Sequence, residues 1–321
     1  MRLFNNLQEL ILYNLSVGAD LGQNKDFGLS LLYENSHNFS PISSFGVIPA
    51  FGGLAILVAD GVPGLSIDLA RVLHGEQYTE LLNPIPSGNL GINNCHFQDV
   101  ISKCRTNVIL LKLVKTTFNL TFISGPVRLS SKFQVSAVLD KGSGALIVVD
   151  VISKDVSTNQ DILRNQLSIF VVGSGGFGGP RTSEKIILPE NPPVNRKPDV
   201  VKEYQTSINQ AALYRLNGDL NPLHIDPQFS ALGGFDRPIL HGLCTEGIAV
   251  RCVTEEFASN DPGKVIAVKA RFAKPVFPGE TIITEMWNNG DKIHFQCIVK
   301  ETKEPCLTGG WIKLAKDASK L

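Results

Sequence analysis

Alternation of hydrophobic and polar residues predicts an antiparallel sheet in the second half of the chain. Apolar residues recur at every second position across residues 292–300, which is typical of a strand with one buried face. A second apolar stretch at 281–287 precedes it, and the Asn, Gly and Asp residues at 288–291 favour a tight turn between the two. A third strand is predicted at 307–314.

The first half of the chain repeats this arrangement. Two predicted strands, residues 132–138 and 145–153, flank a turn at 140–144 that contains glycines able to adopt positive φ. A further strand is predicted at 161–172. Four prolines within residues 189–198 exclude regular structure there, so we predict a linker between two similar halves.

Helical patterns are fewer. Residues 7–17, 207–216 and 243–257 are predicted helices, and Ser207 is a candidate N-cap for the second. A long helix followed by an antiparallel sheet predicts an α+β fold, and the repeat predicts a duplicated one. Residues 94–124 fit neither half, because no turn chemistry places them in the sheet.

Composition and charge exclude several classes of protein. The 321 residues are 43% hydrophobic, which is enough for a sizeable core. Thirty basic and thirty acidic residues leave no net charge, which argues against nucleic-acid binding. No run of apolar residues is long enough for a membrane span, and polar residues near the start argue against a secretory signal. The six cysteines show no zinc-binding spacing, so we predict no metal site.

Residues 173–178 match the GxGxxG pattern of dinucleotide-binding loops, but their context differs. No convincing amphipathic helix and no βαβ unit follow them. The glycines therefore indicate a turn. Neither GxSxG nor GxxxxGK[ST] occurs, so a hydrolase nucleophile elbow and a P-loop have no support.

The densest group of chemically active side chains follows residue 218. Pro222 disfavours helical structure at Asn221. We therefore expect Asp219 and Asn221 in a loop, with His224 opening the next turn. A carboxylate and an imidazole within reach of each other can hold a water, take one proton and donate another. The alternative is an Asx-turn with the histidine on the surface.

Gly242 lies where the helix predicted at 243–257 begins. Helix N-termini present unpaired N–H groups and a partial positive charge. A thioester carbonyl bound there would have its developing negative charge stabilised. The alternative is a plain glycine turn at the start of a helix.

Two motifs together resemble the MaoC-like enoyl-CoA hydratase 2 family. The first, YRLNGDLNPLHIDP, begins at Tyr214 and follows the pattern Y-x-x-x-G-D-x-N-P-x-H; the second, RPILHGLCT, begins at Arg237. Four further stretches are also similar to the family: LHGEQY from Leu73, DKGSG from Asp140, VGSGGFGG from Val172 and ARFAKP from Ala270. The resemblance covers nearly the whole chain except about residues 92–126.

The resemblance implies an α+β double hot-dog, in which each of two hot-dog folds is a long helix wrapped by an antiparallel β-sheet. It assigns residues 1–188 to a first hot-dog that holds the acyl tail and residues 199–316 to a second, catalytic one, followed by a tail at 317–321. Residues 92–126 are then an atypical insertion where the family makes a short connection. They are either a genuine surface excursion or translated non-coding sequence.

The reaction implied by the resemblance is hydration of trans-2-enoyl-CoA to (3R)-3-hydroxyacyl-CoA in peroxisomal fatty acid β-oxidation, with no metal or redox cofactor. Asp219 and His224 become the acid–base pair. In this pair, His224 takes the proton of the water and Asp219 supplies the proton to C2. Asn221 orients the pair or the water, and the Gly242 N–H is the oxyanion donor. The implied substrate-binding residues are His74, Gly75, Lys141, Asp219, Leu220, Asn221, Pro222, Leu223, His224, Gly242 and Phe272.

The last three residues, Ser319, Lys320 and Leu321, match a peroxisomal targeting signal. They predict localisation in the peroxisomal matrix and an import receptor as a partner. The resemblance adds an acyl-CoA thioester substrate and a homodimer. Larger family members carry a dehydrogenase region before the hydratase and often a sterol-carrier region after it; this sequence shows neither, so we expect hydratase activity alone.

Two other functions stay open at this stage. An acyl-CoA thioesterase would share the fold, but the Asp-x-Asn-Pro-x-His motif favours addition of water at a double bond. A non-catalytic acyl-CoA-binding protein would result if the insertion disables the site.

Overall fold

The computed structural model describes residues 6–22, 24–51, 71–84, 92–93, 117–124 and 127–316. The strands of the first half are β1 (Val72–Leu81), β2 (Ile92–Asn93), β3 (Thr117–Ser124), β4 (Val127–Asp140), β5 (Gly144–Asp155) and β6 (Asp161–Val172). The strands of the second half are β7 (Val200–Gln205), β8 (Val265–Phe272), β9 (Thr281–Asn289), β10 (Lys292–Val299) and β11 (Pro305–Leu314).

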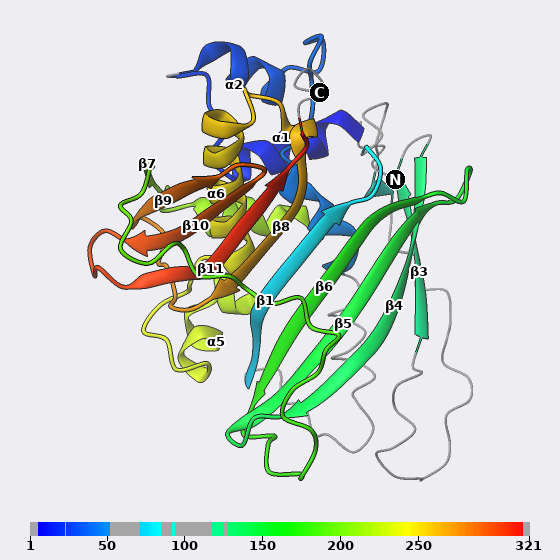
Figure 1. Ribbon diagram of the computed structural model, residues 1–321, viewed down its shortest axis with the longest axis vertical. Helices are drawn as coiled ribbons and strands as arrows, with labels where there is room; N and C mark the ends of the chain where they lie inside the picture. The colour runs from blue at the N-terminus through cyan, green and yellow to red at the C-terminus, as the bar shows by residue number, and fades with distance from the viewer. Residues whose placement is uncertain are drawn as a thin grey trace.

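These strands form one continuous antiparallel sheet (Figure 1). Their order is β2-β3-β4-β5-β6-β1-β8-β11-β10-β9-β7. Each half of the chain therefore contributes one half of the sheet, and the β1–β8 pair joins them.

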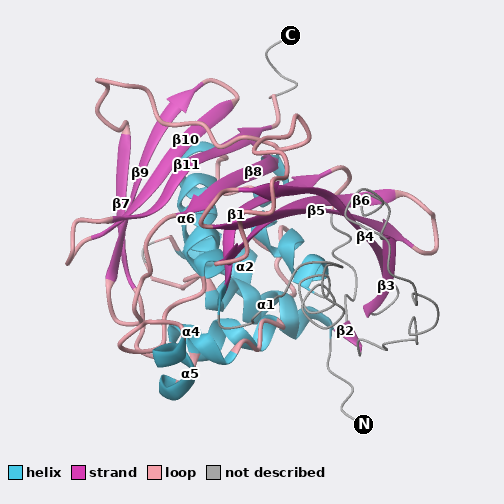
Figure 2. Ribbon diagram, turned by 90° about the horizontal axis from the view of Figure 1, so that it is seen from below, coloured by secondary structure: helices cyan, strands magenta, loops and turns pink. Residues whose placement is uncertain are grey.

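The helices lie on one side of this sheet (Figure 2). They are α1 (Asn6–Ser16), α2 (Lys25–Leu32), η1 (Ser43–Ala50), α4 (Gln210–Tyr214), η4 (Arg215–Asn217), η5 (Pro222–His224), α5 (Pro227–Leu232), α6 (Gly242–Phe257) and η6 (Pro262–Lys264). The longest described helix, α6, packs against the strands of the second half, and η1 packs against those of the first. None of the described helices is long and apolar enough to cross a membrane.

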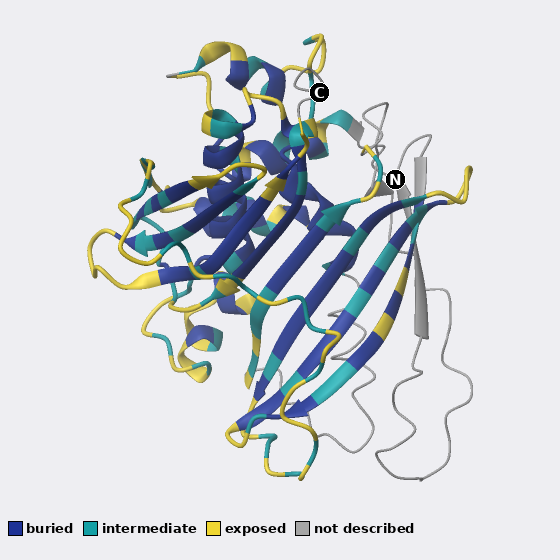
Figure 3. Ribbon diagram, viewed as in Figure 1, coloured by how far each residue is buried: buried dark blue, intermediate teal, exposed yellow. Residues whose placement is uncertain are grey.

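Helix α6 is enclosed by the rest of the molecule. Ile248, Ala249, Val250 and Val253 are all fully buried, although they point to different sides of the helix. Apolar side chains buried on several sides of one helix require packing partners on each of those sides. The strands around it are correspondingly buried, while the turns between them are exposed (Figure 3).

An ion pair crosses the β1–β8 seam. Lys269 is fully buried, and its Nζ lies 2.8 Å from Oε2 of Glu76 on the facing strand. The other carboxylate oxygen of Glu76 lies 2.8 Å from a guanidinium nitrogen of Arg271. A buried ammonium without a partner is strongly destabilising, so this pairing favours the observed register of the two halves.

The proline-rich linker crosses the sheet without regular structure, as the sequence predicted. Two tryptophans hold it: Trp311 Nε1 donates to Leu188 O at 3.2 Å, and Trp287 Nε1 donates to Arg196 O at 2.9 Å. Glu190 N also donates to Gly309 O at 3.0 Å. The linker is therefore fixed to the second half of the sheet at several points.

Most predicted elements are confirmed. Both hairpins, the strand at 161–172 and the helices at 7–17 and 243–257 are present within one to a few residues of the predicted bounds. The strands β1, β7 and β8 were not predicted. In β8, the charged Lys269 and Arg271 interrupt the apolar pattern, and in β1 a bulge at Gly75 shifts the register.

Two expectations were wrong. Residues 94–124 were expected outside the sheet, but β3 pairs along its whole length with β4, from Thr117 opposite Gln134 to Ser124 opposite Val127. The helix expected at 207–216 begins at Gln210, after an N-cap at Asn209. Ser207 does not cap it, because its hydroxyl and N–H are used in a preceding turn with Asn209 N and Gln210 Oε1.

Candidate active site

A tight loop between η4 and α5 positions Asp219 and His224. Gly218 adopts a φ of +118°, which ends η4 and turns the chain. The Asn221 side chain caps η5 by accepting the Leu223 N–H at 3.0 Å, and the Asn221 N–H donates to Asp219 Oδ1 at 3.2 Å. Asp219 and Asn221 thus lie in a loop, and His224 lies in the turn that follows, as predicted.

His224 is oriented as a proton acceptor. Its Nδ1 lies 2.8 Å from the carbonyl oxygen of Ile239. Because a carbonyl oxygen only accepts, Nδ1 carries the proton and Nε2 of the neutral ring can take one. Burial lowers the pKa of His224 below the usual 6.5, and the attraction of Asp219 opposes this shift. The ring is therefore neutral at pH 7.

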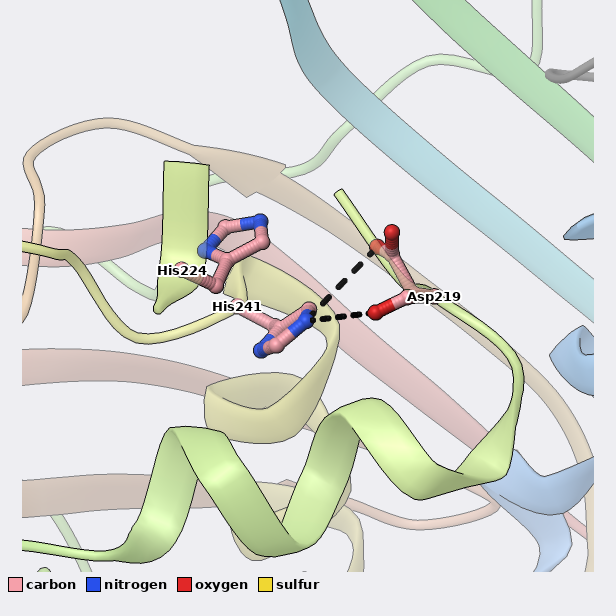
Figure 4. A group of neighbouring side chains, drawn as sticks. All are labelled: Asp219, His224 and His241. Atoms are coloured by element: carbon pink, nitrogen blue, oxygen red, sulfur yellow. Dashed lines mark hydrogen bonds and ion pairs between the residues drawn. The ribbon is translucent and has the colours of Figure 1, made fainter. Parts of the chain in front are cut away.

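His241 is the side chain that contacts Asp219 directly (Figure 4). Its Nε2 lies 3.2 Å from the Asp219 carbonyl oxygen and 4.0 Å from Oδ2. The rings of His224 and His241 stack with centroids 3.6 Å apart. Burial holds the pKa of His241 well below 6.5, and the electrostatic effect of His224 lowers this pKa further. A neutral His241 thus holds the Asp219 backbone and supports the His224 ring.

The three side chains also have the donor types of a metal site. One ligand atom from each of Asp219, His224 and His241 lies within 4.8 Å of the others. However, Nε2 of His241 donates its proton to a carbonyl oxygen, and Nδ1 of His224 does the same. Each ring thus donates one N–H to a backbone carbonyl and keeps its second nitrogen free, and the free Nε2 of His224 can accept a proton.

A cavity of about 290 Å³ opens beside these residues. Its wall is mainly apolar, with a few polar side chains, which is typical of a small-molecule site. The lining residues include His74, Asp219, Asn221, Leu223, His224, Leu240, His241, Gly242, Phe272, Val276 and Leu307.

The N-terminus of α6 reaches this cavity at Gly242. A Cβ added there would lie 2.7 Å from Cδ1 of Phe272, so only glycine fits beside the ring. The Phe272 ring in turn makes an edge contact with His74, at a centroid distance of 5.0 Å. Burial lowers the pKa of His74 to about 4, so this imidazole is neutral as well.

Family comparisons account for both halves of the chain. The MFE-2 hydratase 2 N-terminal domain matches residues 5–121 and 122–173, and the MaoC like domain matches residues 190–309. The chain belongs to the MaoC-like hydratase 2 family.

Curated relatives agree with this family. The chain is 46% identical over 310 residues to the peroxisomal multifunctional enzyme type 2 of Mus musculus, covering 95% of this chain and 36% of that protein. It is 39% identical over 292 residues to the probable enoyl-CoA hydratase 2 of Dictyostelium discoideum, covering 90% of this chain and 84% of that protein. The chain thus spans about a third of the length of the mouse relative.

Solved structures of the MaoC-like family have the same fold. The full-length peroxisomal multifunctional enzyme type 2 from Drosophila melanogaster gives a TM-score of 0.75 at 36% identity, over 97% of this chain and 47% of that chain. A MaoC-like dehydratase from Phytophthora capsici also gives 0.75, at 30% identity, over 98% and 94% of the two chains. The α+β double hot-dog is therefore confirmed.

The structure brings together part of the site expected for a hydratase 2. His74, Asp219, Asn221, Leu223, His224, Gly242 and Phe272 line the cavity. Four other predicted residues do not line it: Gly75, Lys141, Leu220 and Pro222. Gly75 forms the β1 bulge, Leu220 is 60% exposed, and Lys141 lies in the β4–β5 turn. Ser319, Lys320 and Leu321 lie outside the described residues.

Sequence reasoning missed His241 as a member of this hydratase 2 site. The residue precedes Gly242 in the second family motif, but a single histidine before a helix carries no chemistry of its own. Its function depends on stacking with His224, which is 17 positions away, and on the Asp219 carbonyl. The signal that could have found it is the position of a histidine beside the proposed oxyanion donor.

Proposed function

We propose that the protein hydrates trans-2-enoyl-CoA to (3R)-3-hydroxyacyl-CoA. The observation that carries this proposal is the placement of Asp219 and His224 together at an apolar cavity that also reaches the N-terminus of α6. Relatives named enoyl-CoA hydratase 2 in Dictyostelium discoideum and Arabidopsis thaliana support it.

The proposed chemistry moves one proton from water to C2 of the substrate. His224 Nε2 accepts a proton from the water as its oxygen adds to C3. His224 then passes that proton to Asp219, and Asp219 delivers it to C2, so both groups end as they began. One side-chain atom of each residue lies within 4.8 Å of the other, so both additions are proposed to take place on one face of the double bond.

Charge develops on the thioester oxygen during this addition. The Gly242 N–H at the first turn of α6 is the proposed donor to that oxygen, and it reaches a cavity whose wall is mainly apolar. Asn221 is proposed to hold the water, and the first half of the chain to hold the acyl tail.

A direct assay tests this function. Hydration of trans-2-decenoyl-CoA by the purified protein removes the absorbance of the conjugated enoyl thioester without releasing a free thiol. Release of a free thiol would instead favour the hypothesis that the protein is an acyl-CoA thioesterase. Tight binding without any loss of absorbance would favour a non-catalytic acyl-CoA-binding protein.

The pH dependence reports the protonation state of His224. Since burial lowers its pKa below 6.5, the neutral base is fully present at pH 7 and is lost only as pH falls through that lower value. We expect kcat/KM to stay flat near neutral pH and to fall with a midpoint below 6.5. A profile measured from about pH 4.5 to about pH 8 with a midpoint near 7 would contradict this role.

Replacing Gly242 with alanine should damage the oxyanion site. The new Cβ would overlap the Phe272 ring, so either the helix start or the ring must move. We expect kcat/KM to fall about a hundredfold, the range for loss of an oxyanion donor. In a Phe272→Leu background the same change should cost less, because the smaller side chain leaves room. Full activity of Gly242→Ala alone would show that the helix start accommodates a Cβ beside Phe272 and that glycine is not required there.

The protein is placed in the peroxisome. Relatives from mouse, Drosophila and Arabidopsis are named as peroxisomal enzymes. An import receptor that reads the C-terminal Ser-Lys-Leu and a second copy of this chain are the proposed protein partners, in addition to the acyl-CoA substrate.

A further inference from the structure

The glycine loop at residues 173–178 folds around a carboxylate of the protein itself. Asp140, the last residue of β4, accepts the N–H groups of Gly142 at 2.8 Å and Gly176 at 2.9 Å through Oδ1. Its Oδ2 accepts the Gly178 N–H at 2.8 Å. The Asp140 residue is only 6% exposed. Two N–H groups of the glycine loop, those of Gly176 and Gly178, are therefore already occupied by Asp140.

The glycines are required for this contact. Gly176 and Gly178 have φ of +80° and +71°, which other residues rarely adopt. A Cβ on Gly175 would lie 2.3 Å from the Gly142 carbonyl oxygen. The loop thus approaches the β4–β5 turn as closely as backbone atoms allow, and Asp140 holds the two together.

The segment that follows the glycine loop fixes Lys141, the next residue in the turn. The Lys141 N–H donates to Gly144 O at 2.9 Å, and its Nζ donates to Arg181 O, just beyond the glycine loop, at 2.7 Å. A second backbone bond, from Asp140 N to Pro180 O at 2.9 Å, ties the turn to the same segment. An ammonium group has three donors, so this arrangement leaves two for a ligand.

The turn lies at the same end of the sheet as the cavity. Val72, a cavity residue at the start of β1, is opposite Val171 on β6, and Ala145 on β5 is opposite the same Val171. Neighbouring strands are about 4.8 Å apart, so the turn is about 10 Å across the sheet from Val72. Figure 1 shows this turn at the same end of the sheet as the start of β1, with β6 between them.

We propose that Asp140 is a positioning residue for the CoA end of the substrate: it clamps the glycine loop onto the β4–β5 turn and so holds Lys141 toward the phosphates of CoA. This inference rests on the proposed function. It explains why a GxGxxG sequence occurs in a chain with no dinucleotide-binding fold. The loop contributes to anion binding through Lys141, while its own N–H groups bind Asp140.

The test compares two substrates that differ in the phosphates. Asp140→Asn replaces one carboxylate oxygen with an NH₂ group that cannot accept the Gly178 N–H. We expect its KM for trans-2-decenoyl-CoA to rise about tenfold with kcat unchanged. The decenoyl thioester of pantetheine, which lacks the nucleotide phosphates, should show unchanged kcat/KM. Gly176→Ala, which strains the loop without altering a charge, should give the same pattern.

Asp155→Asn is the matched control. Asp155 is 7% exposed and accepts the Ser157 N–H and hydroxyl at 2.7 and 2.6 Å in the turn at the opposite end of β5. The Asp155→Asn variant should therefore leave the KM for both substrates unchanged. In a Lys141→Ala background, Asp140→Asn should add little, because the residue that it positions is gone.

The outcomes separate this inference from the proposed function. If the wild type hydrates the substrate and Asp140→Asn changes neither KM, or changes both equally, the positioning role is wrong and the function stands. If the wild type does not hydrate but binds CoA in a calorimetric titration, and Asp140→Asn weakens that binding about tenfold, the positioning role stands and the function is wrong. A wild type that binds no CoA overturns the positioning role directly.

Discussion

Replacing Asp219 with asparagine should lower kcat for hydration about a thousandfold. Asparagine keeps the size of the side chain and an acceptor for the Asn221 N–H, so the loop should keep its shape. It cannot carry a proton to C2 or exchange one with His224. KM and binding of the 3-hydroxyacyl-CoA product should change little, because the cavity wall is unaltered.

Asp226→Asn is the control for Asp219. Asp226 lies in the same motif and caps α5 by accepting the Gln228 N–H at 2.8 Å. It does not line the cavity, so its loss should affect stability and leave kcat within about twofold of the wild type. Equal activity of Asp219→Asn and the wild type would remove Asp219 from the chemistry.

The second large effect is expected for His224→Gln, with a loss of about a hundredfold or more in kcat. Glutamine can donate to the Ile239 carbonyl oxygen, but it provides no nitrogen that accepts a proton from water. The double variant with Asp219→Asn should be little slower than the slower single variant, because the two groups act as a unit.

His294→Gln provides the comparison for His224. His294 is also a buried histidine, with 7% exposure, but it lies on β10 and does not line the cavity. Its substitution should leave kcat unchanged. Strictly additive losses in the Asp219 and His224 double variant would show that the two residues do not share a proton.

Local chemistry explains what could be predicted from the sequence. Pro222 and Asn221 act within a few residues, so the loop that carries Asp219 and His224 follows from backbone rules. The turns of both hairpins and the apolar run of α6 are likewise visible in short stretches. These features were enough to predict the loop and the helix, whereas the acid–base roles of Asp219 and His224 were implied by the family resemblance and stay a prediction.

Long-range contacts explain what could not be predicted. The seam joins Glu76 to Arg271, almost 200 positions apart, and no local pattern marks either strand as central. Lys269 looks like a surface charge in the sequence and becomes buried only because Glu76 faces it. The support that His241 gives to His224 depends in the same way on two segments that meet only after folding.

Strand β3 is another element whose place in the sheet could not be predicted from the sequence. Its residues were expected outside the sheet because no turn signal precedes them, yet they pair with β4 along its first residues. Pairing to an open edge needs only free backbone groups and a suitable register. The sequence around a strand therefore says little about whether an edge is available to it.

The most direct test of the central claim is the configuration of the product. Purified protein is incubated with trans-2-decenoyl-CoA, and the 3-hydroxyacyl product is resolved by chiral chromatography, with Asp219→Asn as the inactive control. The predicted result is that the wild type consumes the enoyl-CoA and forms the 3R product, whereas the Asp219→Asn variant does not consume it. A 3S product, or equal consumption by the Asp219→Asn variant, would contradict the proposed site and its family chemistry.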